Sequence, residues 1–365
     1  MTRIIVDIPG ERPYDVSVAS GLIDTLGTEI RRLDATNPKA LIITDSVVGP
    51  LLLERVKAAL EAVSYQVSVI TVPAGEEAKS VACASEIWHA MVDCKLNRDS
   101  LVCALGGGVV GDLAGFTAST FMRGIRVVQI PTTLLSMVDS SVGGKTAINL
   151  ESGKNLVGTF TQPLYVCADV DVLATLPERE WACGCGEVVK SAIIDSQGFF
   201  RWLNEHAEKV QQRDAATVQE MVQRCIAFKA AVVARDQEET KGVRECLNYG
   251  HTLAHAIETK AGYGVYAHGH AVAQGMRFAA RLAVAKLGTS LEFVQAQDAL
   301  LDMLGLPEIE LRASAQELLD LMKGDKKVRS GRLRFVLPRD FGAWEVVDLD
   351  DAFVLEYLEA WQRSF

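Results

Sequence analysis

The chain has 365 residues, more than one hydrophobic core usually organises, so two domains are expected. Hydrophobic residues make up 49% of it and charged residues 23%, which is typical of a soluble globular enzyme. The net charge of -10 argues against nucleic acid or an acidic membrane surface as a partner. No apolar run reaches the ~18 residues of a membrane span, and residues 1–7 lack a signal peptide's apolar stretch. Together with eight cysteines in mostly apolar surroundings, this predicts a reduced, cytoplasmic protein.

The first half of the chain alternates short β-type runs with stretches of helical spacing. Residues 1–7 are predicted to form an edge strand, and 40–44 form a second strand that ends at Asp45. This alternation indicates a parallel sheet with crossover helices. Further strands are expected at 66–72, 101–105 and 127–130, and helices at 51–60 and 85–93.

The character of the sequence changes near residue 178. Stretches of helical spacing follow, and β-type runs are nearly absent until 333–337. We therefore expect an α/β nucleotide-binding half over 1–178 and a helical half over 179–365, with the active site in the cleft between them. The helices are expected at 187–194, 199–206, 217–236, 251–260, 271–287, 291–304 and 315–322.

Glycines in the segment Gly106–Asp112 follow an apolar strand and open a helix, as in the G-x-G-x-x-G pattern. Such glycines let backbone N–H groups approach a pyrophosphate at a helix N-terminus. The acidic ribose-binding residue that usually follows about twenty positions later is absent, because that region reads Met122-Arg123-Gly124. Asp45 or Glu76 is available for that role, which indicates a dinucleotide site of unusual layout.

Histidines gather in two segments bounded by glycines. His251 and His255 are four residues apart, so a helix places them on one face, and His268 follows one loop later. Glu187 supplies a carboxylate upstream. Two imidazoles and one carboxylate around an open position are typical of a catalytic divalent metal. Cys183 and Cys185 are possible further ligands, but two thiols without a second pair favour residues at the start of a helix.

Lysines in two glycine-rich loops indicate anion recognition in an otherwise acidic chain. Lys145 follows Gly143-Gly144, and Lys154 follows Gly153. Neither loop has the spacing of a Walker A motif. Other polar residues near the predicted metal ligands favour a substrate with several negative charges. These are Lys190, Lys229, Arg244, Asn248 and the Asp325-Lys326-Lys327 segment.

These segments together resemble the 3-dehydroquinate synthase family of the sugar-phosphate cyclase superfamily. They occur in the family's order and span residues 45–337. The resemblance implies a Rossmann-like α/β N-terminal domain, an all-α C-terminal domain, a homodimer, and the cofactors NAD and zinc or cobalt. The matching stretches are Gly106–Asp112, Pro131–Asn149, Gly153–Gly158, Leu176–Glu180, Gly186–Lys190, Leu247–Glu258, His268–Met276 and Asp325–Lys327.

The resemblance also assigns individual residues. The implied metal ligands are Glu187, His251 and His268. The implied NAD-binding residues are Asp45, Gly75, Glu76, Lys79, Gly108, Val109, Val110, Gly111, Asp112, Thr132, Thr133, Lys145, Lys154, Val172, Leu173, Ala174 and Thr175. The implied substrate-side residues are Arg123 (reaching the partner subunit's site), Asp139, Lys145, Asn155, Lys190, Lys229, Arg244, Asn248, His255 and one of Lys326 and Lys327.

The implied reaction converts 3-deoxy-D-arabino-heptulosonate 7-phosphate, a phosphorylated sugar acid, to 3-dehydroquinate and phosphate in the shikimate pathway of aromatic amino-acid biosynthesis. A transient oxidation at C5 acidifies the neighbouring C–H, phosphate is eliminated, C5 is reduced again, and an aldol step closes the ring. The chain departs from the family in two places. At His270 the family usually has a glutamate, and near Glu239 this chain has one extra residue. His270 is either a competing ligand or a neighbour of the metal.

Three alternatives are open at this stage. The nearest is another cyclase, such as 2-deoxy-scyllo-inosose synthase or 2-epi-5-epi-valiolone synthase, whose substrates lack the carboxylate. A second is a glycerol-dehydrogenase-like oxidoreductase, which would form net NADH. A third is a non-catalytic regulatory protein that binds NAD or metal. Lys229, Arg244 and Asn248 favour the dehydroquinate synthase reading.

Overall fold

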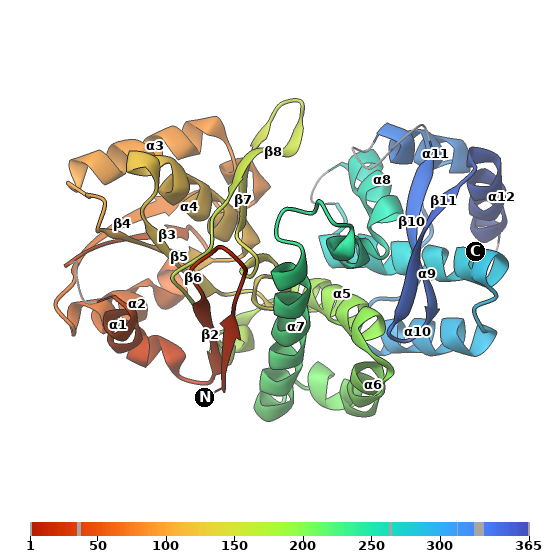
Figure 1. Cartoon of the computed structure of the whole chain (residues 1–365), viewed down its shortest axis with the longest axis horizontal. Helices are drawn as coiled ribbons and strands as arrows, with labels where there is room; N and C mark the ends of the chain where they lie inside the picture. The colour runs from red at the N-terminus through yellow and green to blue at the C-terminus, as the bar shows by residue number, and fades with distance from the viewer. Residues whose placement is uncertain (1, 35–37, 263–264, 312, 325–331, 364–365) are drawn as a thin grey trace. The chain divides into compact units, whose positions relative to one another are not determined.

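The computed structural model of the chain describes residues 2–34, 38–262, 265–311, 313–324 and 332–363. The chain divides into two compact units, shown with the whole chain in Figure 1. The first consists of Met1–Leu176 and Val218–Glu238, and the second of Pro177–Thr217 and Glu239–Phe365. The chain passes from the first unit to the second after Leu176. The segment Val218–Glu238, expected in the helical half, groups with the α/β unit instead.

The first unit is built around a seven-stranded sheet. Its strands are β1 (Thr2–Val6), β2 (Tyr14–Ala19), β3 (Lys39–Asp45), β4 (Gln66–Val72), β5 (Leu101–Gly106), β6 (Arg126–Pro131) and β9 (Tyr165–Asp169). They lie in the order β1-β2-β9-β6-β5-β3-β4, so the start of the chain forms an edge strand as predicted. β1 pairs with β2 antiparallel, and the neighbours from β2 to β4 are parallel.

Helices cover both faces of this sheet, as is usual for parallel strands joined by crossover helices (Figure 1). They are α1 (Leu22–Leu33), α2 (Gly49–Glu61), α3 (Val81–Asp93) and α4 (Gly108–Thr120). Most of α7 (Ala215–Arg235) also belongs to this unit. Figure 1 shows α3 and α4 on one face of the sheet and α1 and α2 on the other. A hydrophobic core of the unit lies between the sheet and α3 and α4, and it includes Ile43, Val102, Leu113 and Val127.

The two glycine-lysine loops predicted from the sequence prove to be parts of one hairpin. Its strands are β7 (Lys145–Leu150) and β8 (Gly153–Phe160), which pair antiparallel in a separate sheet. Gly143 and Gly144 precede β7 with φ values of 102° and 70°, a backbone region that favours glycine. Short helical turns complete the unit at η1 (Glu76–Ala78), η2 (Phe121–Arg123), η3 (Ser136–Ser140) and η4 (Val170–Thr175).

The second unit is mainly helical, as predicted, and its described residues also include a β-hairpin. Its helices are α5 (Glu178–Asp195), α6 (Gln197–Gln211), η5 (Val243–Asn248), α8 (His251–Ala261), α9 (His268–Leu287), α10 (Leu291–Met303), α11 (Ala315–Gly324) and α12 (Asp351–Gln362). The hairpin pairs β10 (Leu333–Asp340) with β11 (Ala343–Leu349). The sequence predicted the first of these strands but neither β11 nor α12.

Helix α9 forms the centre of the second unit. Most of its residues are buried, and α5, α8, α10, α12 and β10 all pack against it. All eight cysteines of the chain are free thiols, in keeping with the expected reduced state. No helix among the described residues is long and apolar enough to cross a membrane.

Candidate nucleotide site and metal centre

Most of the predicted cofactor-binding residues lie at the carboxyl ends of the parallel strands, which all point to the same side of the sheet. Asp45 ends β3, and the glycines from Gly106 onward follow β5, the strand paired beside it. The chain order reverses here, because β4 lies on one side of β3 and β5 on the other. Such a switch point is where open α/β sheets bind nucleotides. Gly75–Lys79 follow β4, Thr132 and Thr133 follow β6, and Val172–Thr175 follow β9.

Glycines in α4 let this helix lie against its neighbours without a side chain between them. A Cβ on Gly111 would lie 2.8 Å from the Gln129 side chain, and one on Gly115 would lie 2.3 Å from Thr146. The N-terminus of α4 therefore stays at the carboxyl ends of the strands, and no side chain caps its first N–H groups, because the N-cap residue is Gly107. Beside it, Oγ1 of Thr132 is buried and has no hydrogen-bond partner among the described residues. Both features suit an anionic, hydrogen-bonding ligand.

Lys79 contacts two other predicted residues of this unit. Its ammonium, only 4% exposed, lies 2.7 Å from Asp112 Oδ2 and 2.5 Å from Asn155 Oδ1. Burial raises the pKa of Asp112, while the Lys79 charge opposes that rise. Asn149, which the sequence analysis did not single out, links Glu76 to the backbone N–H of Asn155. The β7–β8 hairpin is thereby fixed to the edge of the sheet.

Lys229 and Asp139 form a second polar pair in the α/β unit. The Lys229 ammonium lies 2.6 Å from Asp139 Oδ1 and 2.5 Å from the Asp139 carbonyl oxygen. Lys229 lies on the part of α7 that groups with this unit, which explains how a residue far along the sequence reaches η3. Both residues were predicted on the substrate side, and the structure places them together.

The structure brings together the three residues of the helical unit that were predicted to bind a metal, and they make up the candidate metal centre. Glu187 lies within α5, while His251 and His268 are the first residues of α8 and α9. Nε2 of His251 and Nε2 of His268 each lie 3.5 Å from Glu187 Oε1. Ligands about 2.0–2.2 Å from a tetrahedral zinc ion are separated by about 3.3–3.6 Å, so these spacings suit one ion. Among the described residues this is the one group of three such side chains found close enough to share a metal.

Charge around Glu187 favours a cation in the same place. The carboxylate is 1% exposed, and neither oxygen makes a hydrogen bond of good geometry within the described parts of the chain. Burial would raise its pKa, but the paired Lys190 ammonium and the His268 ring outweigh burial and hold the pKa at about 2. His268 lies between Glu187 and Glu258; burial opposes its protonation, yet the two carboxylates raise its pKa to about 10. A divalent cation would replace that proton.

Glycine contacts fix the helices that present these ligands. A Cβ on Gly269 would lie 1.9 Å from the Cys183 carbonyl oxygen, and one on Gly186 would lie 2.6 Å from the Gly269 carbonyl oxygen. On the other side of α9, a Cβ on Gly275 would lie 1.8 Å from the carbonyl oxygen of Gly250. Backbones this close leave no room for a methyl group. The three candidate metal ligands therefore lie on helices whose spacing is set by glycine.

Cys183 and Cys185 are not part of this centre. Both lie in the interior of α5, past the first turn where the sequence placed them. Cys183 Sγ accepts a hydrogen bond from the Gly269 N–H, and burial raises the pKa of Cys183 to about 12. A thiol that stays protonated is a poor metal ligand. His270 is also outside the group, and burial lowers its pKa.

The remaining predicted residues are distributed over both units. In the helical unit, Lys190 is buried beside Glu187, Arg244 is buried in η5 and lies 3.5 Å from Glu239, and Asn248 ends η5. His255 lies one turn after His251, with ring centroids 5.7 Å apart.

In the α/β unit, Arg123 and Lys145 are exposed and Lys154 is half-buried. Lys326 and Lys327 lie outside the described residues. Glu258, which contacts His268, was not assigned from the sequence, although its position seven residues after His251 places it on the same face of α8.

Comparison with known proteins identifies the family. The 3-dehydroquinate synthase N-terminal model matches residues 69–183, and the C-terminal model matches residues 184–328. A 3-dehydroquinate synthase of Desulforamulus reducens is 44% identical over 98% of this chain and 99% of its own length. One from Rhodopirellula baltica is 43% identical over 91% of this chain and 90% of its own. The chain belongs to the 3-dehydroquinate synthase family.

Solved structures of other cyclases share this family's fold. A 2-deoxy-scyllo-inosose synthase complexed with carbaglucose-6-phosphate, NAD+ and Co2+ superposes with a TM-score of 0.90 at 25% identity, over 98% of this chain and 99% of that one. A 2-epi-5-epi-valiolone synthase from Streptomyces hygroscopicus, with NAD+ and Zn2+ bound, has a TM-score of 0.87 at 26% identity, over 99% of both chains. A probable glycerol dehydrogenase from Sinorhizobium meliloti, at 17% identity and a TM-score of 0.63, shares the fold alone.

Proposed function

We propose that the protein converts 3-deoxy-D-arabino-heptulosonate 7-phosphate to 3-dehydroquinate and phosphate, a step of the shikimate pathway. One observation carries the assignment: identity to proteins named 3-dehydroquinate synthase is 44% over nearly the whole chain. Identity to the solved cyclases that act on other sugar phosphates is 25–26%. The enzyme is thus a carbon–oxygen lyase rather than a net dehydrogenase.

Both cofactors fit the residues present. The carboxyl edge of the sheet in the α/β unit suits NAD, with the N-terminus of α4 facing a pyrophosphate and Asp45 or Glu76 available for a ribose. Glu187, His251 and His268 suit zinc or cobalt. When bound, NAD supplies reversible hydride transfer and the cation supplies Lewis acidity toward a hydroxyl group. We assign residues 1–178 mainly to the nucleotide and 179–365 mainly to metal and substrate.

Cationic side chains are assigned to the two anionic ends of the substrate. Arg244 is 2% exposed, and its planar guanidinium can bind a carboxylate through two parallel hydrogen bonds. Lys229 is assigned to the same carboxylate, and its partner Asp139 orients the ammonium. Lys145 and Asn155 are assigned to the phosphate end. Arg123 is assigned to the partner subunit's site, and one of Lys326 and Lys327 to the substrate.

Proton transfer is assigned to residues around the metal centre. Lys190 beside Glu187 keeps that carboxylate ionised, so it remains a ligand. His255 lies one helical turn from His251 and is a candidate for proton relay, with Asn248 orienting a substrate hydroxyl. The substrate phosphate can itself take the proton lost in elimination, so this step does not require a separate protein base.

The cellular setting and assembly are part of the proposal. Eight free cysteines, most of them buried, support a reducing compartment, and we assign the protein to the cytoplasm. We assign a homodimer on the family resemblance. A phosphorylated sugar acid is the expected small-molecule partner.

One assay separates this function from its alternatives. The purified protein is incubated with the heptulosonate phosphate, NAD and zinc or cobalt, and inorganic phosphate and NADH absorbance are followed together. The expected result is one phosphate released per substrate consumed, without net NADH, because the nicotinamide that accepts the hydride returns it. NADH formed in proportion to substrate would support a dehydrogenase, and no turnover would support a binding protein.

A further inference from the structure

Tyr249 is fully buried just before the helix that begins with His251. Its hydroxyl donates a 2.5 Å hydrogen bond to Gln297 Oε1 of α10 and lies 3.3 Å from the carbonyl oxygen of Met276 in α9. The Gln297 amide, also fully buried, donates to the same Met276 carbonyl at 3.3 Å. The phenol ring is therefore fixed by two helices that lie far from it in the sequence.

The peptide that joins Tyr249 to His251 is equally constrained. Gly250 has φ 81°, and a Cβ on it would lie 2.9 Å from the Met276 backbone nitrogen. The Gly250 carbonyl oxygen lies against Gly275, where a Cβ would come within 1.8 Å of it. Tyr249 and Gly250 thus rest together on the middle of α9, and His251 follows from this fixed point.

The backbone of Tyr249 also contacts the imidazole ring of His251. Nδ1 of His251 lies 3.1 Å from the Tyr249 carbonyl oxygen. A carbonyl oxygen only accepts hydrogen bonds, so this contact requires the proton on Nδ1. The other ring nitrogen, Nε2, then has a lone pair, and it is Nε2 that lies 3.5 Å from Glu187 Oε1. The carbonyl sets both the ring orientation and the tautomer that a metal needs.

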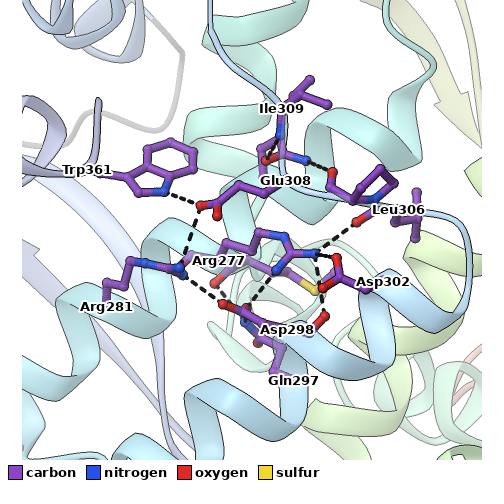
Figure 2. A network of polar contacts seen from close by, with 12 residues as sticks. Arg277, Arg281, Gln297, Asp298, Asp302, Leu306, Glu308, Ile309 and Trp361 are labelled. Carbon is purple, nitrogen blue, oxygen red and sulfur yellow. Dashed lines mark hydrogen bonds and ion pairs between the residues drawn. The ribbon is translucent and has the colours of Figure 1, made fainter. Parts of the chain in front are cut away.

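Gln297 is itself held by a polar network, shown in Figure 2. Its neighbour Asp298 pairs with Arg277 at 3.3 Å and with Arg281 at 3.1 Å. Arg277 is 2% exposed and also binds Asp302 at 2.6 Å. These contacts fix the register of α10 against α9, and so they fix the acceptor that faces the Tyr249 hydroxyl.

We propose that Tyr249 and Gln297 are positioning residues for the metal ligand His251. They hold the Tyr249 carbonyl where it keeps the proton on Nδ1 and directs Nε2 toward the cation. This inference rests on the proposed metal site but assigns a task to residues that touch neither metal nor substrate. Without the phenol hydroxyl, the Tyr249 carbonyl is less firmly held. The tautomer of His251 that carries the proton on Nε2 then gains population.

The test uses the full-length chain and three variants. Tyr249→Phe removes the hydroxyl, and Gln297→Met removes its acceptor without altering Tyr249. Trp361→Phe is the matched control, because it removes a 2.5 Å hydrogen bond from the indole to Glu308 in the network of Figure 2. Thermal midpoints are measured on metal-free protein, and zinc dissociation constants are measured by competition with a chelator.

All three variants are expected to lose thermal stability, but only two should lose zinc affinity. Tyr249→Phe and Gln297→Met should raise the zinc dissociation constant about tenfold, the lower end of the effect of removing a group that orients a metal-binding histidine. Trp361→Phe should leave it unchanged. In ¹⁵N-histidine-labelled protein at mildly alkaline pH, Tyr249→Phe should also shift the His251 ring nitrogens toward the other tautomer.

Unchanged zinc affinity and an unchanged His251 tautomer in both variants would overturn the proposed positioning role. An equal loss of affinity in Trp361→Phe would overturn it as well, because the effect would then be general destabilisation. Failure of the metal site itself has a separate signature. In that case the wild type would not bind zinc, or His251→Ala would bind it as tightly as the wild type.

Discussion

Gly275→Ala tests the closest backbone contact near the metal centre. The added Cβ would lie 1.8 Å from the Gly250 carbonyl oxygen and 2.7 Å from its carbon, whereas real Cβ atoms essentially never approach closer than 3.0 Å. The obstacle is backbone rather than the end of a flexible side chain, so α8 and α9 must separate. Overpacking of this kind costs about 1–3 kcal/mol, and the rigid partner places this case at the upper end.

A helical glycine replaced by alanine also gains helix propensity, about 1 kcal/mol in an unobstructed position. The net expectation is a loss of about 2 kcal/mol in the free energy of unfolding. Gly198→Ala in α6 is the matched control, because its nearest neighbour would be Ser196 Oγ at 3.9 Å. That variant should be slightly more stable than the wild type, so the same substitution has opposite signs at the two positions.

Urea unfolding followed by tryptophan fluorescence measures the difference. Four of the five tryptophans, at positions 181, 202, 344 and 361, belong to the helical unit, so the signal reports mainly on that unit. The transition midpoint of Gly275→Ala should fall and that of Gly198→Ala should stay or rise. If Gly275→Ala proved as stable as Gly198→Ala, the helices would not be held at the distance described and the argument would fail.

Three further predictions concern binding and pH. His251→Ala should keep the fold and lose tight zinc or cobalt binding, measured by equilibrium dialysis; full metal content would remove His251 from the ligand set. Arg244→Lys should lower kcat/KM for the heptulosonate phosphate by the equivalent of about 2 kcal/mol or more, because an ammonium cannot replace the bidentate guanidinium; an unchanged value would refute the recognition role. Hydrogen bonds from Lys260 and Ser314 hold the pKa of Glu317 at about 2, below its ordinary 4.5. The contribution of the ionised Glu317 to the free energy of unfolding is present above pH 4.5 and is lost as the pH falls toward 2. Glu317→Gln should therefore lose less stability than the wild type between these pH values. Equal losses would contradict a stabilising role for the Glu317 carboxylate.

Local patterns in the sequence predicted the elements that carry the candidate sites. The apolar run that ends at Asp45 and the glycines after residue 105 located two strand ends, and the structure pairs those strands side by side. The helical spacing of residues 251–260 predicted helix α8, which places His251 and His255 one turn apart. The structure brings Glu187 and His268 to the same point, which agrees with the residue types chosen from the sequence.

Other features depend on contacts that no local pattern contains. Lys145 and Lys154 follow glycines, so the sequence predicted glycine-rich loops where the structure has the two paired strands β7 and β8. The helical spacing of α7 predicted a helix but could not show that most of this helix belongs to the α/β unit rather than to the helical unit. Tyr249 meets an acceptor 48 residues further along the chain, and only the packing of α9 against α10 brings them together.

The order of the segments along the chain has a consequence for synthesis and for truncation. The α/β unit is interrupted after Leu176 and resumes at Val218, so it is not complete until residue 238 has been made. At about 5–20 residues per second, the last segment follows the first several seconds later. A fragment ending at Leu176 would leave Asp139 without the lysine that pairs with it, on a helix the fragment lacks. Fragments meant to isolate nucleotide binding should therefore carry residues 218–238, joined by a linker or by circular permutation.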